Sequence, residues 1–396
     1  MPSPVKLSQR ISSIEASAIM QVAAVAAKLR ARGQDIVDFG PGEPDFPTPA
    51  NIKRAAIRAI QENFTRYTAV GGTVELREAI CERHAADFGT SYTPSECMVT
   101  AGGKHALFNV LQSLIDPGDE VIIPVPYWVT FRDIVHYSGG TSVFAHTDSE
   151  DGFPITASLI ERHLTDKTRA VVINSPCNPS GEVIAPEEFR QIYRLTSKRG
   201  IWLITDECYC HLVYDGLPFS VASTPGARST VIVTGSLSKM YAMTGWRIGF
   251  VLAPPRVVSA AAKLQSQSTS NPNSIAQKAA VEAVSGPQDS REEMLAEYRR
   301  RRDFALEKLR SIPGVRCHQP KGAFYLYPNV SAVLGRDGIE DTAQLAERLL
   351  EKAGVAVIPG EAFGSSGHIR LTFAVSMRDI DRGMGRLRTF ILGLSK

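Results

Sequence analysis

Short apolar runs alternate with helical patterns through most of this chain, and this alternation narrows the possible folds more than any other feature. Runs typical of strands lie at 120–124, 170–174, 202–205, 230–234 and 248–252. Helical patterns, such as 106–114 and 186–198, lie between most of them. Alternating strands and helices favour a largely parallel sheet with helices on both faces. The sequence therefore predicts an α/β fold.

The pattern changes after Pro287. A long charged helical pattern lies at 290–309. Short strand-like runs follow near Val315 and at 323–327, 355–358 and 369–373, and two further helical patterns lie at 341–352 and 377–392. Because 396 residues are many for one core, we expect a larger domain at 49–288 and a smaller α+β domain at 289–396. The segment 1–48, with a helix at 18–32 and a strand at 36–39, is expected to join the smaller domain. The acid-flanked run Arg299–Arg302 is predicted to be a solvated helix face.

Composition argues against several classes of protein. The net charge of +3 is too small to indicate binding to nucleic acid. No apolar run is long enough to cross a membrane, and no signal peptide is recognisable. The six cysteines follow neither metal-ligand nor disulfide-framework spacing. We therefore expect a cytoplasmic protein that binds neither nucleic acid nor membranes and needs no metal.

One lysine stands out for its setting. Lys239 follows the strand-like run 230–234, and open α/β sheets bind ligands at the carboxyl ends of their strands. Ser236 and Ser238 precede it, and Arg247 follows eight residues later. A lysine beside hydroxyls and a guanidinium suits an imine-forming amine next to a phosphate group. Gly103 and Lys104 open a helix whose free N–H groups favour the same anion.

A second strand end carries an acid. Asp206 ends the run 202–205, and Tyr209 follows three residues later. Asn178 lies in the segment 174–181, after another predicted strand. A buried carboxylate can keep a pyridine nitrogen protonated, so that the ring stabilises a carbanion.

The segment Ser236–Gly249 resembles the lysine motif of class I, fold-type I aminotransferases, which use pyridoxal 5′-phosphate. The resemblance implies a mostly parallel seven-stranded sheet in a large domain. It also implies that Lys239 is the lysine that forms an imine with the cofactor. By the same resemblance, Asp206 pairs with the ring nitrogen, Tyr209 and Asn178 bind the phenolic oxygen, and Trp128 stacks on the ring.

The same resemblance implies the substrate contacts and a homodimer. Arg370 looks like the arginine that clamps the substrate α-carboxylate, and Gly42 like the loop glycine beside it. Tyr67 resembles the tyrosine that reaches the phosphate bound to the other subunit. Lys104 resembles the residue that holds a distal carboxylate in the bacterial aspartate aminotransferases, which this chain resembles most.

The implied reaction is a ping-pong transfer of an amino group from an L-amino acid to a 2-oxo acid. Lys104 favours aspartate or glutamate with 2-oxoglutarate as acceptor, whereas Glu15 and Ile19 depart from the subgroup and favour a less acidic substrate, because like charges repel. One alternative is the same cofactor with another donor, in an aromatic/prephenate aminotransferase or an aminotransferase for another amino acid. Others are a lyase, cyclase or oxidase of the same fold, and a non-catalytic regulator. The regulator would need a DNA-binding domain, for which the first 40 residues leave no room.

Overall fold

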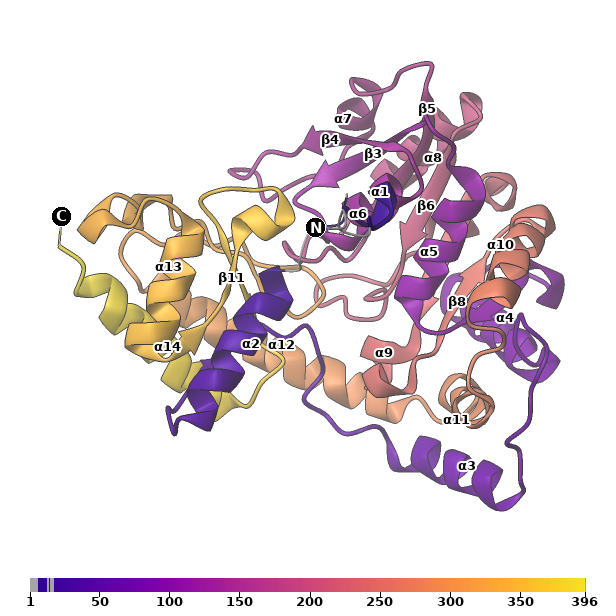
Figure 1. Ribbon diagram of the computed structural model, residues 1–396, viewed down its shortest axis with the longest axis horizontal. Coiled ribbons are helices and arrows are strands. Elements are labelled where there is room, and N and C mark those ends of the chain that lie inside the picture. Colours follow the sequence, from indigo (N-terminus) through magenta and orange to yellow (C-terminus); the bar gives the residue numbers. More distant parts are fainter. Residues whose placement is uncertain (1–5, 13, 15–17, 396) are drawn as a thin grey trace, which may run out of the picture.

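The structure, a computed structural model, describes residues 6–12, 14 and 18–395. Its main sheet is built from seven strands, β2 Cys97–Thr100, β3 Glu120–Val125, β4 Thr141–His146, β5 Thr168–Asn174, β6 Trp202–Asp206, β7 Val231–Ser236 and β8 Gly249–Leu252. Their order is β2-β8-β7-β6-β5-β3-β4 (Figure 1). Neighbours run parallel except β8, which is antiparallel to β2 and β7. The predicted α/β fold with a mostly parallel seven-stranded sheet is therefore confirmed.

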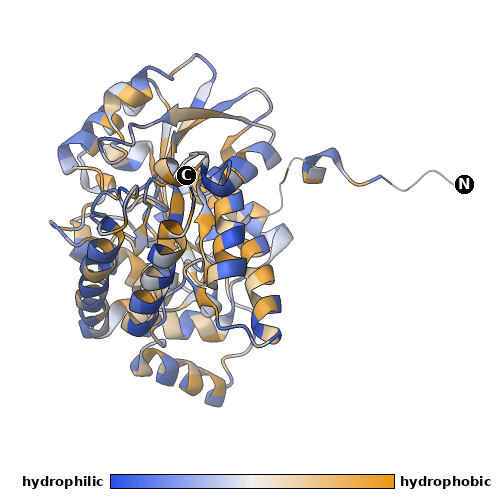
Figure 2. Ribbon diagram, turned by 90° about the vertical axis from the view of Figure 1, so that its left-hand side faces the viewer, coloured by the Kyte–Doolittle hydropathy of each residue, from blue (hydrophilic) through white to orange (hydrophobic). Residues whose placement is uncertain are grey.

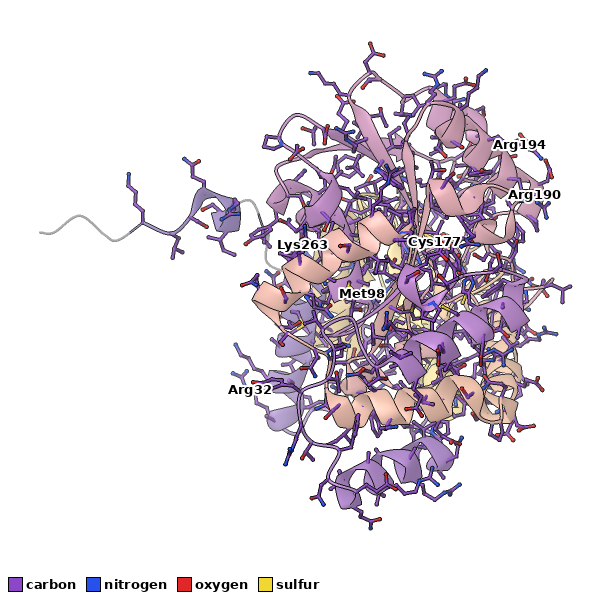
Figure 3. The ribbon with its side chains drawn as sticks, turned by 90° about the vertical axis from the view of Figure 1, so that its right-hand side faces the viewer. Arg32, Met98, Cys177, Arg190, Arg194 and Lys263 are labelled. Atoms are coloured by element: carbon purple, nitrogen blue, oxygen red, sulfur yellow. The ribbon has the colours of Figure 1, made fainter. Side chains whose placement is uncertain are left out.

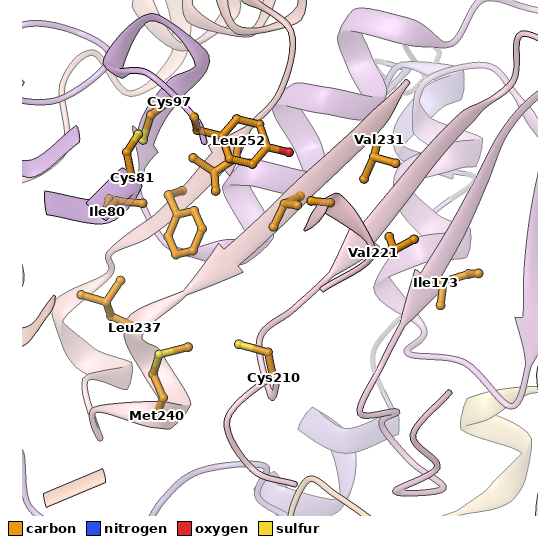
Figure 4. Close-up of a cluster of buried hydrophobic side chains, with 14 of the residues drawn as sticks. Ile80, Cys81, Cys97, Ile173, Cys210, Val221, Val231, Leu237, Met240 and Leu252 are labelled. Carbon is orange, nitrogen blue, oxygen red and sulfur yellow. The ribbon is translucent and has the colours of Figure 1, made fainter. Parts of the chain in front are cut away.

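Alternate residues of the central strands pack into two apolar clusters, one on each face of the sheet. Val171 and Ile173 of β5 belong to one cluster, part of which Figure 4 shows around Val231. Ala170 and Val172 of the same strand belong to the other. Side chains of successive strand residues point to opposite faces, so apolar residues at every position bury the sheet on both sides.

Helices supply the other half of each cluster. One face is covered by α5 Gly103–Leu114, α6 Thr130–Tyr137 and α10 Pro255–Ser268, and the other by α3 Ala50–Gln61, α4 Val74–Phe88, α7 Ala157–Glu161, α8 Pro186–Lys198 and α11 Ser274–Ser285. Arg190 and Arg194 of α8 lie at the periphery, whereas Met98 of β2 lies inside (Figure 3). Figure 2 shows that hydrophilic and hydrophobic residues are mixed along the helices.

The remaining elements pack together beside α12. They are strands β1 Val37–Asp38, β9 Tyr325–Leu326, β10 Val355–Ala356, β11 Ile358–Pro359 and β12 Ile369–Thr372, with helices α2 Ala18–Ala31, α12 Asp289–Arg310, α13 Thr342–Arg348 and α14 Met377–Leu392. Helix α1 Gln9–Ser12 lies apart from them beside α6, where the Arg10 guanidinium lies over the ring of Tyr137. β1 pairs with β10 in parallel, and β11, β12 and β9 form an antiparallel sheet. Phe39 therefore joins an apolar cluster made mostly of residues after 290. The domain boundaries near 48 and 288 stay predictions.

Only Arg299 and Arg300 of the run Arg299–Arg302 are exposed, as its charge suggested. Arg301 is only 7% exposed and Arg302 only 2%. Arg301 donates to Asp45 at 2.7 Å, and Arg302 donates to Asp215 at 2.7 Å. Both guanidinium groups also lie over aromatic rings, those of Phe46, Tyr298 and Tyr214. The prediction of a solvated face is wrong for Arg301 and Arg302, because these partners are distant in sequence and cover this side of α12.

Over the stretches that the structure describes, no helix is both long enough and apolar enough to cross a membrane.

Candidate active site

Strands β2, β5, β6 and β7 run in one direction, so their carboxyl ends meet at one edge of the main sheet. Asn174 at the end of β5 is in register with Asp206 at the end of β6. Ser236 at the end of β7 and Thr100 at the end of β2 both pair with Gly249, the first residue of β8. A cavity of about 490 Å³ lies at this edge.

Lys239 projects into this cavity from a single helical turn after β7, α9 Leu237–Met240. The Ser236 hydroxyl starts that turn, because its oxygen accepts from the Ser238 N–H at 3.1 Å. The Lys239 ammonium donates to the carbonyl oxygen of Gly42. Burial lowers the pKa of Lys239, which increases the share of neutral, nucleophilic amine at physiological pH.

Asp206 lines the same cavity as a buried carboxyl group. Its Oδ1 accepts from the Cys208 N–H at 3.1 Å. Burial, with a smaller contribution from the charge of Glu207, raises the pKa of Asp206 to about 7. Among the residues described, no cation forms an ion pair with it. A cation placed opposite Asp206 would favour its ionised form.

Glu207 points away from the cavity into a separate polar cluster. Its carboxylate accepts from Ser220 at 2.6 Å and lies 3.2 Å from Nε2 of His84. Glu207 therefore has no contact with the site, in agreement with the prediction that it lies on the opposite side from Asp206.

Arg370 is a fully buried guanidinium on β12 that also lines the cavity. It donates to the Gly40 carbonyl at 2.5 Å and to Oδ1 of Asn178 at 3.0 Å. Its Nε has no partner in the described part of the protein. Since Oδ1 of Asn178 is occupied by Arg370, the amide NH₂ of Asn178 is left to donate elsewhere.

Tyr209 is buried beside a residue that sequence reasoning missed. Its hydroxyl lies 2.7 Å from the hydroxyl of Tyr325, which also lines the cavity. Burial raises the pKa of both tyrosines, so both are neutral hydroxyls that can donate. Tyr325 lies on a two-residue strand, and no residue pattern near it marks a function.

The turn from β2 into α5 forms a cradle beside Arg247. Gly102 has a positive φ of 90°, and a Cβ there would lie 2.3 Å from the Arg247 guanidinium. A Cβ on Gly249 would lie 2.4 Å from the backbone of Gly102. The first N–H groups of α5 have no intrahelical acceptor, and Arg247 has no ion pair among the described residues. Glycine, free N–H groups and an unpaired guanidinium together suit a phosphate group.

The last part of the cavity combines a cation with an aromatic ring. The Lys104 ammonium lies 5.1 Å from the ring centroid of Trp128. Lys104 is exposed as a residue, but partial burial of its ammonium group and the nearby charge of Arg247 lower its pKa. Asp133 opposes that change. Asp133 also lines the cavity and was not predicted.

All but one of the predicted site residues line this cavity: Gly42, Gly103, Lys104, Trp128, Asn178, Asp206, Tyr209, Ser236, Ser238, Lys239, Arg247 and Arg370. The exception is Tyr67, which is 91% exposed in the loop between α3 and α4. Glu15 and the side chain of Ile19 lie outside the described residues. Ile14 and Met20, from the same part of the chain, line the cavity.

These residues fit pyridoxal phosphate in charge and shape. The glycine cradle and Arg247 suit its phosphate group. The carboxyl group of Asp206, which is buried without an ion-pair partner among the described residues, suits its protonated ring nitrogen. The amine of Lys239 suits its aldehyde.

Comparison with known proteins agrees with this fit. The family Aminotransferase class I and II matches residues 34–387. The aspartate/prephenate aminotransferase of Nitrosomonas europaea is 42% identical over 395 residues, covering 98% of this chain and 100% of that protein. The aspartate aminotransferase of a Bacillus species is 40% identical over 387 residues, covering 97% and 99%.

Solved structures agree as well. The crystal structure of aspartate aminotransferase from Rhizobium meliloti superposes with a TM-score of 0.95 at 40% identity, covering 99% of this chain and all of that one. That of aspartate aminotransferase from Thermus thermophilus with maleate gives 0.92 at 40% identity, covering 98% and 100%. This chain belongs to the class I and II aminotransferases, and its cofactor is pyridoxal phosphate.

Proposed function

We propose that this enzyme transfers an amino group between aspartate or glutamate and a 2-oxo acid, with 2-oxoglutarate as an acceptor. One observation carries the choice of substrate. Beside Arg247 and Lys239, whose amine suits the cofactor aldehyde, the cavity is lined by two further cations, Arg370 and Lys104, and neither forms an ion pair within the described residues. If Arg247 takes the cofactor phosphate, two cations remain for two carboxylates.

The relatives support a dicarboxylic substrate. Those compared above are named as aspartate or aspartate/prephenate aminotransferases, and one neighbour was solved with maleate, a dicarboxylate. Prephenate is a second candidate acceptor. The apolar side chains of Ile14 and Met20 and the ring of Trp128, which line the cavity, could pack against its ring.

The proposed chemistry assigns a proton carrier and a charge partner. Pyridoxal phosphate supplies an aldehyde that condenses with amines and a ring that withdraws electrons from the substrate Cα. Lys239, whose pKa is lowered by burial, would be the base that takes the proton from the substrate Cα and the acid that returns it. Asp206 keeps the ring nitrogen protonated, because its buried carboxylate is stable only with a cation opposite.

The remaining residues orient the reactants. Arg370 holds the α-carboxylate, and its own position is fixed by the Gly40 carbonyl and Asn178. Tyr209 and the free amide group of Asn178 donate to the phenolic oxygen of the cofactor. Lys104 holds the distal carboxylate.

Lys239→Ala tests the chemistry. Wild-type protein should be yellow, and borohydride should reduce the chromophore onto Lys239. The variant should lose transamination by several orders of magnitude, because the nucleophile and the proton carrier are the same group. Lys198→Ala, at the exposed end of α8, is the control and should keep wild-type activity. Substantial activity in Lys239→Ala would refute the assignment.

A half-reaction screen tests the substrate. Each of the twenty amino acids is mixed with enzyme while the cofactor absorbance is followed from the aldehyde to the amine form. Aspartate and glutamate should react fastest. Equal rates with neutral amino acids would leave the reaction class standing and reject the dicarboxylic preference.

We also propose that the enzyme is a cytoplasmic homodimer with shared active sites. Tyr67 is 91% exposed and outside its own cavity, and Ile57 and Ile60 of α3 are 52% and 53% exposed. A second copy of the chain would cover these apolar side chains and bring Tyr67 to its phosphate site. The six cysteines are free thiols, in keeping with a reducing compartment. Sedimentation at micromolar concentration should give twice the chain mass.

We propose that the chain divides into a domain of residues 49–288 and a smaller one of 289–396 joined by 1–48. The pairing of β1 with β10 and the shared apolar cluster support this division.

A further inference from the structure

We propose that Tyr325 is a positioning residue that couples the hydroxyl of Tyr209 to the guanidinium of Arg370, and so couples the cofactor contact to the substrate contact. The inference rests on the roles proposed for Tyr209 and Arg370.

The first half of the link is a hydrogen bond between two buried hydroxyls. The Tyr325 and Tyr209 oxygens are 2.7 Å apart, and the residues are 1% and 5% exposed. Each hydroxyl has one hydrogen to donate. If Tyr209 donates its hydrogen to the cofactor, it must accept one from Tyr325. Hydrogen bonds in such a chain polarise one another, so Tyr325 makes Tyr209 a stronger donor.

The second half is a cation on an aromatic face. The guanidinium carbon of Arg370 lies 4.5 Å from the ring centroid of Tyr325 and 5.0 Å from that of Phe363. A cation so close to a phenol ring draws electron density from it and makes its hydroxyl a better donor. Burial raises the pKa of Tyr325, and the positive charge of Arg370 accordingly lowers it against that rise. Phe363 touches the same cation and has no hydroxyl.

The backbone fixes Tyr325 in this place. β9 pairs with β12, with Tyr325 opposite Thr372, two residues after Arg370. On its other side the Tyr325 hydroxyl meets the loop at Gly42, where a Cβ would lie only 2.3 Å away. The carbonyl of Gly42 is the acceptor of the Lys239 ammonium. Tyr325 therefore contacts or adjoins groups that face cofactor, substrate and lysine.

Tyr325→Phe separates the two halves, because it keeps the ring beneath Arg370 and removes the hydroxyl. The readout is the pH midpoint of the visible absorbance change of the bound cofactor. A hydrogen bond from Tyr209 to the phenolic oxygen of the cofactor stabilises the ionised form of this oxygen. It therefore lowers the pH at which the bound cofactor loses its proton. A weaker donor keeps that proton to higher pH. We expect the midpoint of Tyr325→Phe to lie about half a pH unit above that of the wild type. A shift of one pH unit corresponds to about the free energy of one hydrogen bond, and Tyr325 acts on the cofactor only through Tyr209.

Two further variants make the test specific. In a Tyr209→Phe background, adding Tyr325→Phe should move the midpoint by less than about 0.1 unit, because the mediator is gone. Phe363→Leu should raise KM for the amino acid and leave the midpoint unchanged.

The link is overturned if Tyr325→Phe leaves the midpoint unmoved, if it moves the midpoint equally without Tyr209, or if Phe363→Leu moves it as much. In those cases the cofactor still absorbs and the proposed function stands. Absence of the absorbance from wild-type protein would reject both.

Discussion

Asp206 provides a test of the site that needs no turnover. In the cofactor-free protein, burial raises its pKa from 3.8 to about 7. Between pH 4 and 7 the folded chain therefore holds one proton more than the unfolded chain, so stability falls as pH rises through this window and is level above it. A change of about 3 pH units, at about 1.4 kcal/mol each, makes the full cost about 4 kcal/mol. Asp206→Asn removes this cost, since the amide does not titrate.

The assay is urea unfolding of both cofactor-free proteins at pH 5 and pH 8. The free energy of unfolding of Asp206→Asn, relative to that of the wild type, should rise by about 2.5 kcal/mol from pH 5 to pH 8. This is less than the full cost, because part of that cost is already present at pH 5. Groups remote from Asp206 titrate alike in the two proteins and cancel. Saturating pyridoxal phosphate should narrow the gap at pH 8, because the ring cation offsets the buried charge. A gap that is the same at both pH values would refute the argument that Asp206 is buried without a cation.

Three further predictions concern substrate choice, the buried arginines and the dimer. Lys104→Ala should weaken kcat/KM for aspartate more than for phenylalanine by about 1.5–3 kcal/mol, the strength of a charge-assisted hydrogen bond; equal losses would assign Lys104 to the cofactor or the fold. Arg301→Gln should lower the free energy of unfolding by about 2 kcal/mol, because Asp45 is left without its partner. Arg300→Gln, one residue earlier and 61% exposed, is its control and should cost less than about 0.5 kcal/mol. Tyr67→Phe should weaken pyridoxal phosphate binding about tenfold, as loss of one bond to a charged group does, and unchanged affinity in equilibrium dialysis would contradict the shared site.

Sequence patterns predicted the parts of the fold that depend on neighbouring residues. The helices at 186–198 and 377–392 were predicted with the bounds that the structure has, because a period of 3.6 residues is a local property. The strand predicted near Val315 is wrong, since only an isolated bridge forms there, between Arg316 and Asn329. Strands β2 and β4 were missed, because neither contains a long apolar run: β2 has four residues, and β4, at the edge of the sheet, has polar residues at both ends.

The site divides in the same way. Lys239, Asp206 and Arg247 could be located because each follows or precedes an apolar run that fixes its place at the sheet edge. Tyr325 could not, because its importance comes from Tyr209 and Arg370, which are 116 residues before it and 45 after it in the sequence. Burial of Arg301 likewise depends on a loop around Asp45.

The close contact between Gly42 and Tyr325 also constrains the order in which these two residues can be substituted during evolution. A methyl group at position 42 would lie 2.3 Å from the Tyr325 oxygen but 3.4 Å from the ring carbon that bears it. Alanine at 42 is therefore excluded while position 325 is tyrosine, and is tolerated once it is phenylalanine. A lineage that begins from this sequence can acquire both changes only if the tyrosine is replaced first, so the two sites cannot diverge independently.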